Sequence, residues 1–174
     1  MLDLTLLDTF AGIERVRVAA NQQMASTDDD LFCIGRSGAE TYGLGAREDI
    51  VKAGGGNDLL VGGGGDDFLF GQGGDDRIIG GTGFDRLIGS IGADTFVFEL
   101  GGGLDLVFDF ENGTDLLDVT FFGFDDFSRD ILPFIRDIAG KAVIDFLSGE
   151  RVVLSGVAQS DLDASDFIGV TAPS

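Results

Sequence analysis

The sequence contains no histidine and no tryptophan, and only one cysteine and one tyrosine. Without histidine, the chain lacks the Ser-His-Asp and Cys-His catalytic arrangements, the His-based zinc motifs and the usual general base at neutral pH. The single cysteine, Cys33, excludes an intramolecular disulfide and is expected to be a small buried apolar residue. The absence of tryptophan, with Tyr42 as the only tyrosine, argues against the usual aromatic platforms for sugars.

Basic residues are scarce as well. Eleven Lys and Arg stand against 31 Asp and Glu, which gives a net charge of −20 and makes nucleic acid and anionic membranes poor partners. No stretch approaches the ~18 apolar residues of a membrane span. The first ten residues, MLDLTLLDTF, have no basic region, so no cleavable secretory signal is expected. A hydrophobic content of 44% with sixteen phenylalanines nevertheless favours a packed core in a single domain.

Glycine, in contrast, is abundant at 29 residues, and much of it follows a period of nine. Aspartate stands at every ninth position, at Asp58, Asp67, Asp76, Asp85 and Asp94. An apolar residue stands two positions after each aspartate, at Leu60, Leu69, Ile78, Leu87 and Phe96. A glycine stands two positions before each, at Gly56, Gly65, Gly74, Gly83 and Gly92. The repeating unit therefore reads G-G-x-G-x-D-x-(apolar)-x.

This unit does not suit an α-helix. Nine residues are about 2.5 helical turns, so successive aspartates would fall on opposite faces, and each interior glycine would cost about 1 kcal/mol. Six turn-forming residues followed by three strand residues, such as LLV or FLF, fit better, with the middle side chain pointing inward. Stacked units of this kind form a solenoid in which each unit contacts its neighbours.

The unit resembles the RTX, or hemolysin-type, nonapeptide repeat, which is already known as a calcium-binding β-helix unit. The resemblance is strongest over residues 53–97. After a two-residue insertion it continues in GGGLDLVFDF, through Gly101, Gly103, Asp105 and Val107. Upstream it weakens: LGAREDIVK keeps Gly45, Asp49 and Val51, whereas GRSGAETYG keeps Gly38 but has Glu40 where aspartate belongs. Neither Asp30 nor Glu40 is included among the expected ligands.

The resemblance implies an all-β fold, a right-handed parallel β-roll with two nonapeptides per coil and a C-terminal cap. Residues eighteen apart should then stack one strand spacing apart, ~4.8 Å. Asp58 would lie over Asp76 and then Asp94, and Asp67 over Asp85 on the opposite edge. Carboxylates at that spacing repel by roughly 1 kcal/mol even in water, so the roll should fold only when calcium is bound.

The resemblance also implies the ligands, namely the carbonyls of positions two and four and the carboxylate of position six, with about four to five Ca²⁺ ions per chain. The expected ligands are Asp49, Gly54, Gly56, Asp58, Gly63, Gly65, Asp67, Gln72, Gly74, Asp76, Gly81, Gly83, Asp85, Ser90, Gly92, Asp94, Gly101, Gly103 and Asp105. Gln72 and Ser90 depart from glycine at position two, where strain in the loop is expected.

Three other interpretations of the glycine-rich run fail. A flexible linker would not keep an apolar residue in phase with an aspartate through five repeats. No G-x-G-x-x-G or G-K-[ST] phosphate-binding motif occurs. DFENGTDLLDV suggests an EF-hand loop, but Gly113 falls at the fifth position from Asp109 instead of the sixth.

Beyond the repeats, the segments LVFDF, DLLDV, AVIDF and RVVLSGV are predicted to be strands, with SGE turning between the last two. A short helix is predicted from about Asp130 to before Gly140, because Pro133 fits only in a first turn. The chain thus divides into degenerate coils at 1–48, the calcium-binding roll at 49–109 and a cap at 110–174, within one continuous domain. The position-nine residues, from Val61 to Val97, are also apolar, and we expect the C-terminal hairpin and helix, or a second subunit, to cover part of the face that they form.

We therefore interpret the chain as a calcium-binding module, not an enzyme, of a protein secreted to the extracellular space. Its ending, Asp166-Phe167-Ile168, is similar to the acidic-then-apolar end of type I secretion substrates with these repeats, although a turn packed on the cap explains it equally well. The alternative is a polysaccharide-binding or adhesion accessory module, or the C-terminal piece of a secreted polysaccharide-acting enzyme or protease. Oligomerisation is left open.

Overall fold

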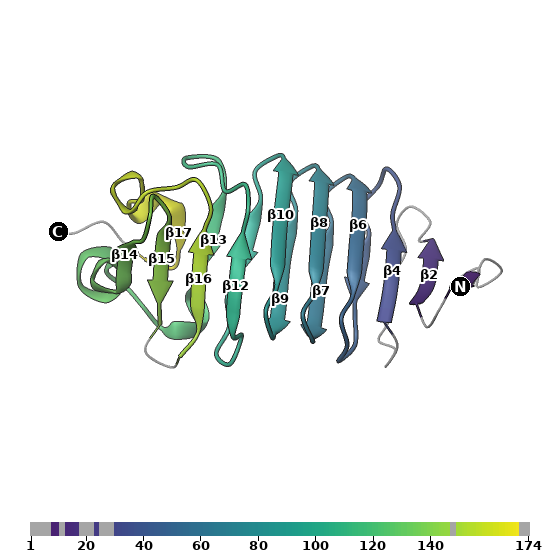
Figure 1. The fold of residues 1–174 in the computed structure, drawn as a ribbon. Helices are drawn as coiled ribbons and strands as arrows, with labels where there is room; N and C mark the ends of the chain where they lie inside the picture. Colours follow the sequence, from purple (N-terminus) through teal and green to yellow (C-terminus); the bar gives the residue numbers. More distant parts are fainter. Residues whose placement is uncertain (1–7, 11–12, 18–22, 25–29, 147–148, 171–174) are drawn as a thin grey trace.

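Two sheets face each other along the length of the molecule in the computed structural model (Figure 1). The structure describes residues 8–10, 13–17, 23–24, 30–146 and 149–170, with side chains from residue 30 onward. The ten-stranded sheet contains, in spatial order, β1 (Asp8–Phe10), β2 (Ile13–Arg17), β4 (Asp30–Ile34), β6 (Ile50–Gly55), β8 (Phe68–Gly73), β10 (Arg86–Ile91), β12 (Leu104–Val107), β16 (Arg151–Leu154), β15 (Ala142–Asp145) and β14 (Ile135–Asp137). The seven-stranded sheet contains β17 (Phe167–Ile168), β13 (Leu116–Asp118), β11 (Thr95–Val97), β9 (Arg77–Thr82), β7 (Leu59–Gly64), β5 (Thr41–Gly43) and β3 (Gln23–Met24).

The chain alternates between the two sheets, and each sheet is parallel through the repeats. Ile50 pairs with Phe68 and Phe68 with Arg86, a register of eighteen residues. The same register joins Leu59 to Arg77 in the seven-stranded sheet. The expected all-β parallel β-roll with two nonapeptides per coil is confirmed.

The core is a double column of position-eight side chains between the sheets. Leu60, Leu69, Ile78, Leu87 and Phe96 are all 0% exposed. The column continues through Val107 and Leu117, which pair with Leu87 and Phe96 in the next strands. A two-position alternation in each strand therefore places one side chain inside and its neighbours outside.

The C-terminal cap continues both sheets edge to edge. The predicted hairpin is present, because β15 pairs antiparallel with β16, and β16 extends the ten-stranded sheet parallel to β12. Strand β17 extends the seven-stranded sheet by pairing with β13. The hairpin lies at the end of the roll, beyond most of the outward position-nine side chains. Of those side chains only Val97 is buried, at 2% exposed.

The short helix is confirmed but its predicted limits are wrong. A π-helical turn, η2 (Phe127–Ile131), is followed directly by a 3₁₀ turn, η3 (Leu132–Phe134), and residues 135–137 form β14. The helix begins early because Asp126 is its N-cap and accepts a bond from the Arg129 amide. It ends early because Ile135 pairs with Ile144 of the hairpin.

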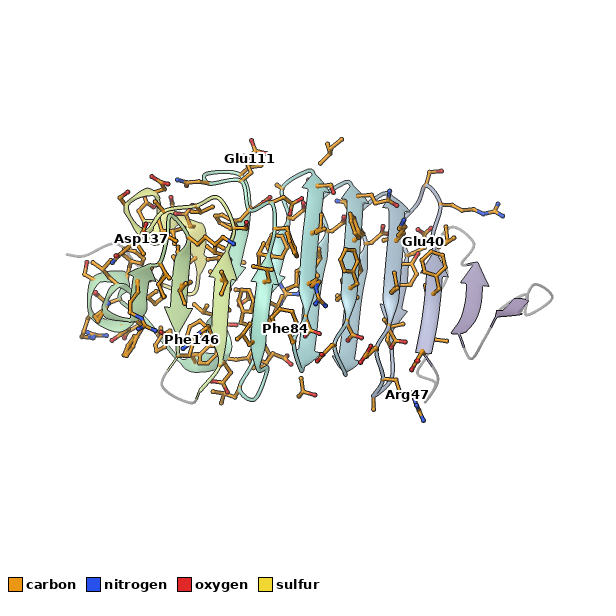
Figure 2. All side chains as sticks on the ribbon, in the orientation of Figure 1. Glu40, Arg47, Phe84, Glu111, Asp137 and Phe146 are labelled. Atoms are coloured by element: carbon orange, nitrogen blue, oxygen red, sulfur yellow. The ribbon has the colours of Figure 1, made fainter. Side chains whose placement is uncertain are left out.

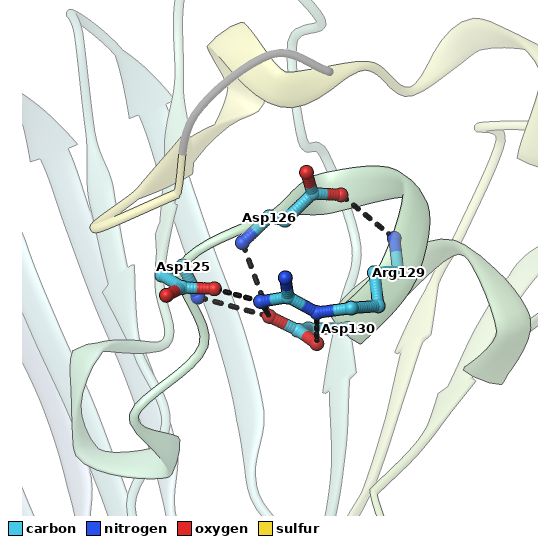
Figure 3. Close-up of polar contacts among 4 residues, drawn as sticks. All are labelled: Asp125, Asp126, Arg129 and Asp130. Carbon is cyan, nitrogen blue, oxygen red and sulfur yellow. Dashed lines mark hydrogen bonds and ion pairs between the residues drawn. The ribbon is translucent and has the colours of Figure 1, made fainter. Parts of the chain in front are cut away.

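Arg129 anchors this turn (Figure 3). Its guanidinium binds the carboxylates of Asp125 and Asp130, and Asp130 accepts bonds from the amides of Asp125 and Asp126. The remaining 3₁₀ turns are η1 (Thr120–Phe122), η4 (Gln159–Asp161) and η5 (Ala164–Asp166). In the described part of the chain, no helix has the length and apolar character needed to cross a membrane.

Candidate metal centre

The position-six aspartates form two ladders, one along each edge of the roll where loops lead into strands. In each ladder, Oδ1 of one aspartate accepts a bond from the backbone amide of the residue eighteen positions earlier. Asp76 accepts from Asp58 at 2.8 Å, and Asp94 accepts from Asp76 at 2.9 Å. On the other edge, Asp85 accepts from Asp67 at 2.9 Å. The predicted stacking of these aspartates on opposite edges is confirmed.

The second carboxylate oxygen of each aspartate is what makes the ladders unusual. Oδ2 is buried and has no hydrogen-bond partner among the described residues at Asp49, Asp58, Asp67, Asp76, Asp85 and Asp94. An unpaired buried carboxylate oxygen is costly, because burial removes its hydration without replacing it. Six such oxygens in register are therefore expected only where a cation completes them.

Position-one glycines make room for these oxygens. A Cβ on Gly62 would lie 2.2 Å from Asp67 Oδ2, and one on Gly71 would lie 2.1 Å from Asp76 Oδ2. Gly80 and Gly89 repeat this relation to Asp85 and Asp94. At these four positions only glycine leaves room for the free oxygen, whereas Leu44 and Ala53 stand at position one before Asp49 and Asp58. Sequence reasoning assigned positions two and four and missed position one, although its glycines were the available signal.

The predicted carbonyl ligands lie in the same loops, with a backbone that favours glycine. Positions two and four have positive φ throughout the repeats, for example 112° at Gly54 and 116° at Gly74. A Cβ on Gly74 would lie 2.3 Å from the carbonyl oxygen of Gly56 in the adjacent coil. Gln72 and Ser90 adopt the same conformation at φ of 81° and 78°, so the strain expected there is present.

Burial of the carboxylates raises their pKa values. Loss of hydration is the largest cause, and neighbouring carboxylates add to it. The pKa is raised to about 8 at Asp67, about 7 at Asp76 and about 6 at Asp58 and Asp94. The hydrogen bonds that backbone amides donate to Oδ1 lower these pKa values, but by less than burial raises them. The ladders are thus electrostatically unfavourable when ionised, which is the condition a bound cation relieves.

The ladders end differently from what the repeat alone predicts. Asp105 accepts a bond from the Asp85 amide at 3.2 Å, despite the two-residue insertion. On the other edge Asp115 accepts from Asp94 at 2.9 Å with Oδ1 and from Glu111 at 2.8 Å with Oδ2, so both of its oxygens are satisfied. Sequence reasoning missed Asp115, although Leu117 two positions later carries the aspartate-x-apolar signal.

Two further sets of residues take part in the contacts between coils at these edges. Glu40 is buried, and its amide donates to Asp58 Oδ1 at 2.7 Å, which places Glu40 in the ladder at a position where the repeat would have aspartate. Exposed position-five side chains form an outer ladder, in which Asn57 accepts from the Asp75 amide and Asp75 from the Ala93 amide. These outer bonds link adjacent coils without using the buried oxygens.

The donor set is made of oxygen. In the part of the chain that the structure describes, no three acidic or cysteine side chains converge on one point. A cation at these edges would therefore combine a few carboxylates with loop carbonyls. A hard cation that accepts six to eight oxygens in flexible geometry fits such a set, and Ca²⁺ is of this kind.

Comparison with known proteins agrees with this chemistry. A four-copy family model described as the RTX calcium-binding nonapeptide repeat matches residues 44–78 and 70–104. The comparison with curated proteins found no match.

Two solved structures are similar to the chain. One is the solution structure of the AlgE6R3 subunit from the Azotobacter vinelandii mannuronan C5-epimerase, at 27% identity and a TM-score of 0.56. The alignment covers 71% of this chain and 78% of that one. The other is the extracellular lipase LipA from Serratia marcescens, at 16% identity and a TM-score of 0.46. That alignment covers 92% of this chain and 40% of the lipase.

Proposed function

Because residues 44–104 are RTX calcium-binding nonapeptide repeats, we propose that this chain is a module that folds when its two aspartate ladders bind calcium. The observation that carries the proposal is the row of buried Oδ2 atoms without partners, four of which, at Asp67, Asp76, Asp85 and Asp94, face a position-one glycine. Calcium bound there supplies the positive charge that the ladders lack. Because the unfolded chain has no such site, binding energy becomes folding energy.

The proposed ligands combine both kinds of oxygen. The carboxylates come from Asp49 and from the position-six aspartates up to Asp105, and the carbonyls from positions two and four of each loop, from Gly54 to Gly103. Glycines 62, 71, 80 and 89 keep the space open in front of Oδ2. About four to five ions would occupy the two edges, each held between neighbouring coils. The three segments, 1–48, 49–109 and 110–174, would then behave as one domain.

The experiment is a calcium titration followed by far-UV circular dichroism. The chain should be mostly coil in chelator and gain β-structure in millimolar calcium, with magnesium a poor substitute because it demands tight octahedral geometry. Native mass spectrometry of the folded chain counts the ions. A chain that is equally folded after exhaustive calcium removal would contradict the proposal.

We further propose that the module works outside the cell. Calcium is scarce in the cytosol and millimolar outside, so an acidic chain would remain extended inside and fold after export. A type I secretion apparatus reading the Asp166–Ile168 ending suits this order of events.

Deleting residues 162–174 would also remove β17, so point variants give the cleaner test of export. Asp166→Asn and Ile168→Ala variants that retain calcium-dependent folding should accumulate less in the medium of cells carrying a matching exporter. Undiminished export would contradict a role of this ending as the signal.

A second candidate function is polysaccharide binding, with no catalytic role for this chain. It is favoured by one observation: the outward face of the ten-stranded sheet carries the rings of Phe68 and Phe70, 4.8 Å apart, with Lys52 Nζ 6.0 Å from the Phe70 ring. One similar structure is a subunit of a mannuronan C5-epimerase, a polysaccharide-modifying enzyme. The two functions are compatible, because calcium binds the edges of the roll and the sheet faces remain available.

A further inference from the structure

The outward face of the ten-stranded sheet over β6, β8 and β10 is unusual for so acidic a chain. Its two rows of side chains are Ile50, Phe68 and Arg86, and Lys52, Phe70 and Ile88. We call these six residues the outer face; strands β6, β8 and β10, which carry them, lie in the front sheet in Figure 1 and in Figure 2. The six include no acidic residue, although the chain carries a net charge of −20.

The two cations of the outer face rest on aromatic rings. Lys52 Nζ lies 6.0 Å from the centroid of the Phe70 ring, and the Arg86 guanidinium lies 4.7 Å from that of Phe84. Phe68 and Phe70 lie side by side, with ring centroids 4.8 Å apart. Among the residues that the structure describes, neither Lys52 nor Arg86 forms an ion pair, whereas Arg77, Arg129, Arg136 and Arg151 all do. The face thus offers two positive charges beside apolar rings, of which Lys52 stands apart from the described carboxylates and Arg86 shares a hollow with Asp30, Glu48, Asp49 and Asp66.

From this chemistry we propose that the outer face binds an extended, anionic polysaccharide of the polyuronate class. The carboxylates of such a chain would pair with Lys52 and Arg86, and the apolar faces of its sugar rings would lie on Phe70, which Phe68 supports from the side. Strands in the sheet repeat at ~4.8 Å, close to the rise per sugar of an extended 1,4-linked chain. Successive sugars can therefore meet equivalent positions on successive strands.

The surroundings define the path of the chain. Acidic position-five side chains, Glu48 and Asp66, border the outer face on the side of the Ile50–Phe68–Arg86 row and also line a hollow of about 340 Å³ there. They would repel a uronate, so the sugar chain runs along the row of Lys52, Phe70 and Ile88, and Arg86 is the contact closest to the acidic border. A second copy of the protein fits less well, because pairing two such faces would bury four cations without a carboxylate in the face.

The inference rests on the polysaccharide function proposed above and not on the calcium ligands. Sugar binding can therefore fail while calcium-dependent folding holds, and the reverse. Calorimetry would measure binding of a 1,4-linked hexagalacturonate to the full, calcium-loaded chain. The matched ligand is the same hexamer fully methyl-esterified, which has no charge. Two variants are compared with the wild type: the double variant Lys52→Gln/Arg86→Gln, and the single variant Phe70→Ala. The control is Arg47→Gln, because Arg47 is an exposed cation in a loop outside the outer face. Each variant's calcium midpoint is measured first by circular dichroism.

We expect the charged hexamer to bind, and the esterified one to bind at least about tenfold more weakly. The double variant and Phe70→Ala should each lose about tenfold or more in affinity, while Arg47→Gln stays within about twofold. Equal affinity for both hexamers, no binding by the folded chain, or an unaffected double variant would overturn the inference. So would self-association of the wild type that Phe70→Ala abolishes, because the face would then be an interface between copies.

Discussion

Asp76 lies in the middle of its ladder, between Asp58 and Asp94, and is joined to both through amide-to-carboxylate bonds. Asp76→Asn keeps an oxygen acceptor for the Asp58 amide but removes the charge of a proposed ligand that two neighbouring calcium sites would share. Loss of one charged interaction of ~1.5–3 kcal/mol should raise the calcium midpoint about tenfold to a hundredfold. The measurement is the calcium titration by circular dichroism.

Asp30→Asn is the control for that change, because Asp30 lies in the degenerate region and is only half-buried. Its calcium midpoint should stay close to that of the wild type. Equal effects of the two substitutions would mean that the ladder does not bind calcium in the proposed register.

Gln72 and Ser90 are non-glycine residues whose backbone has the positive φ that favours glycine. A left-handed conformation costs roughly 1–2 kcal/mol for other residues, and part of this is offset because glycine gains more freedom in the unfolded chain. Ser90→Gly should therefore stabilise the calcium-bound chain by about 0.5–1 kcal/mol in urea unfolding. Gly74→Ala should have the opposite effect, since its Cβ would meet the Gly56 carbonyl oxygen at 2.3 Å. Stabilisation by both would contradict this account of the loops.

At the scale of elements, β17 closes the open edge of β13 and brings Phe167 against the ring of Phe127, with centroids 5.5 Å apart. Phe167 is 5% exposed, so Phe167→Ala should lower the free energy of unfolding by about 3–5 kcal/mol. Phe121 is 54% exposed, so Phe121→Ala should change it by no more than about 0.5 kcal/mol. Urea unfolding in saturating calcium measures both, and a small effect at Phe167 would show that the tail is dispensable for the cap.

At the scale of the whole molecule, the two ladders make calcium-free folding depend on pH. The pKa values of Asp58, Asp67, Asp76 and Asp94 are raised to about 6–8 in the fold, above the ~3.9 of an unfolded aspartate. Because the fold holds these protons more tightly than the unfolded chain, protonation at low pH stabilises the fold. This stabilisation is lost as pH rises from about 4 through the raised pKa values. In chelator, β-structure should therefore increase from pH 8 to pH 5.

Calcium binding should show the opposite pH dependence. Calcium requires the ionised carboxylates, so protons compete with it and the calcium midpoint should rise as pH falls from 8 to 5. Titrations at the two pH values, with free calcium buffered, test this. A midpoint independent of pH would mean that the raised-pKa aspartates are not the ligands.

Much of this molecule follows from its sequence alone. The nine-residue period indicated a solenoid of turn-and-strand units with the position-eight side chain inside, because each repeat contains its own turn and its own short strand. The parallel roll with two units per coil, and with it the stacking of aspartates eighteen residues apart, was what the resemblance to the RTX repeat implied. The chemistry of the edges was predictable for the same reason, since Asp58, Asp76 and Asp94 occupy identical positions in identical units.

Only the tertiary structure decided what depends on contacts between coils or beyond the repeats. The fit of Asp67 Oδ2 against Gly62, and the place of Asp115 at the end of its ladder, depend on how neighbouring coils approach. The helix limits followed from the pairing of Ile135 with Ile144, which no local pattern signals. The cap extends the sheets because the open edges of β12 and β13 required partners for their backbone groups. Local periodicity thus specifies the repeating part, and the non-repeating part is specified by the edges that the repeats leave open.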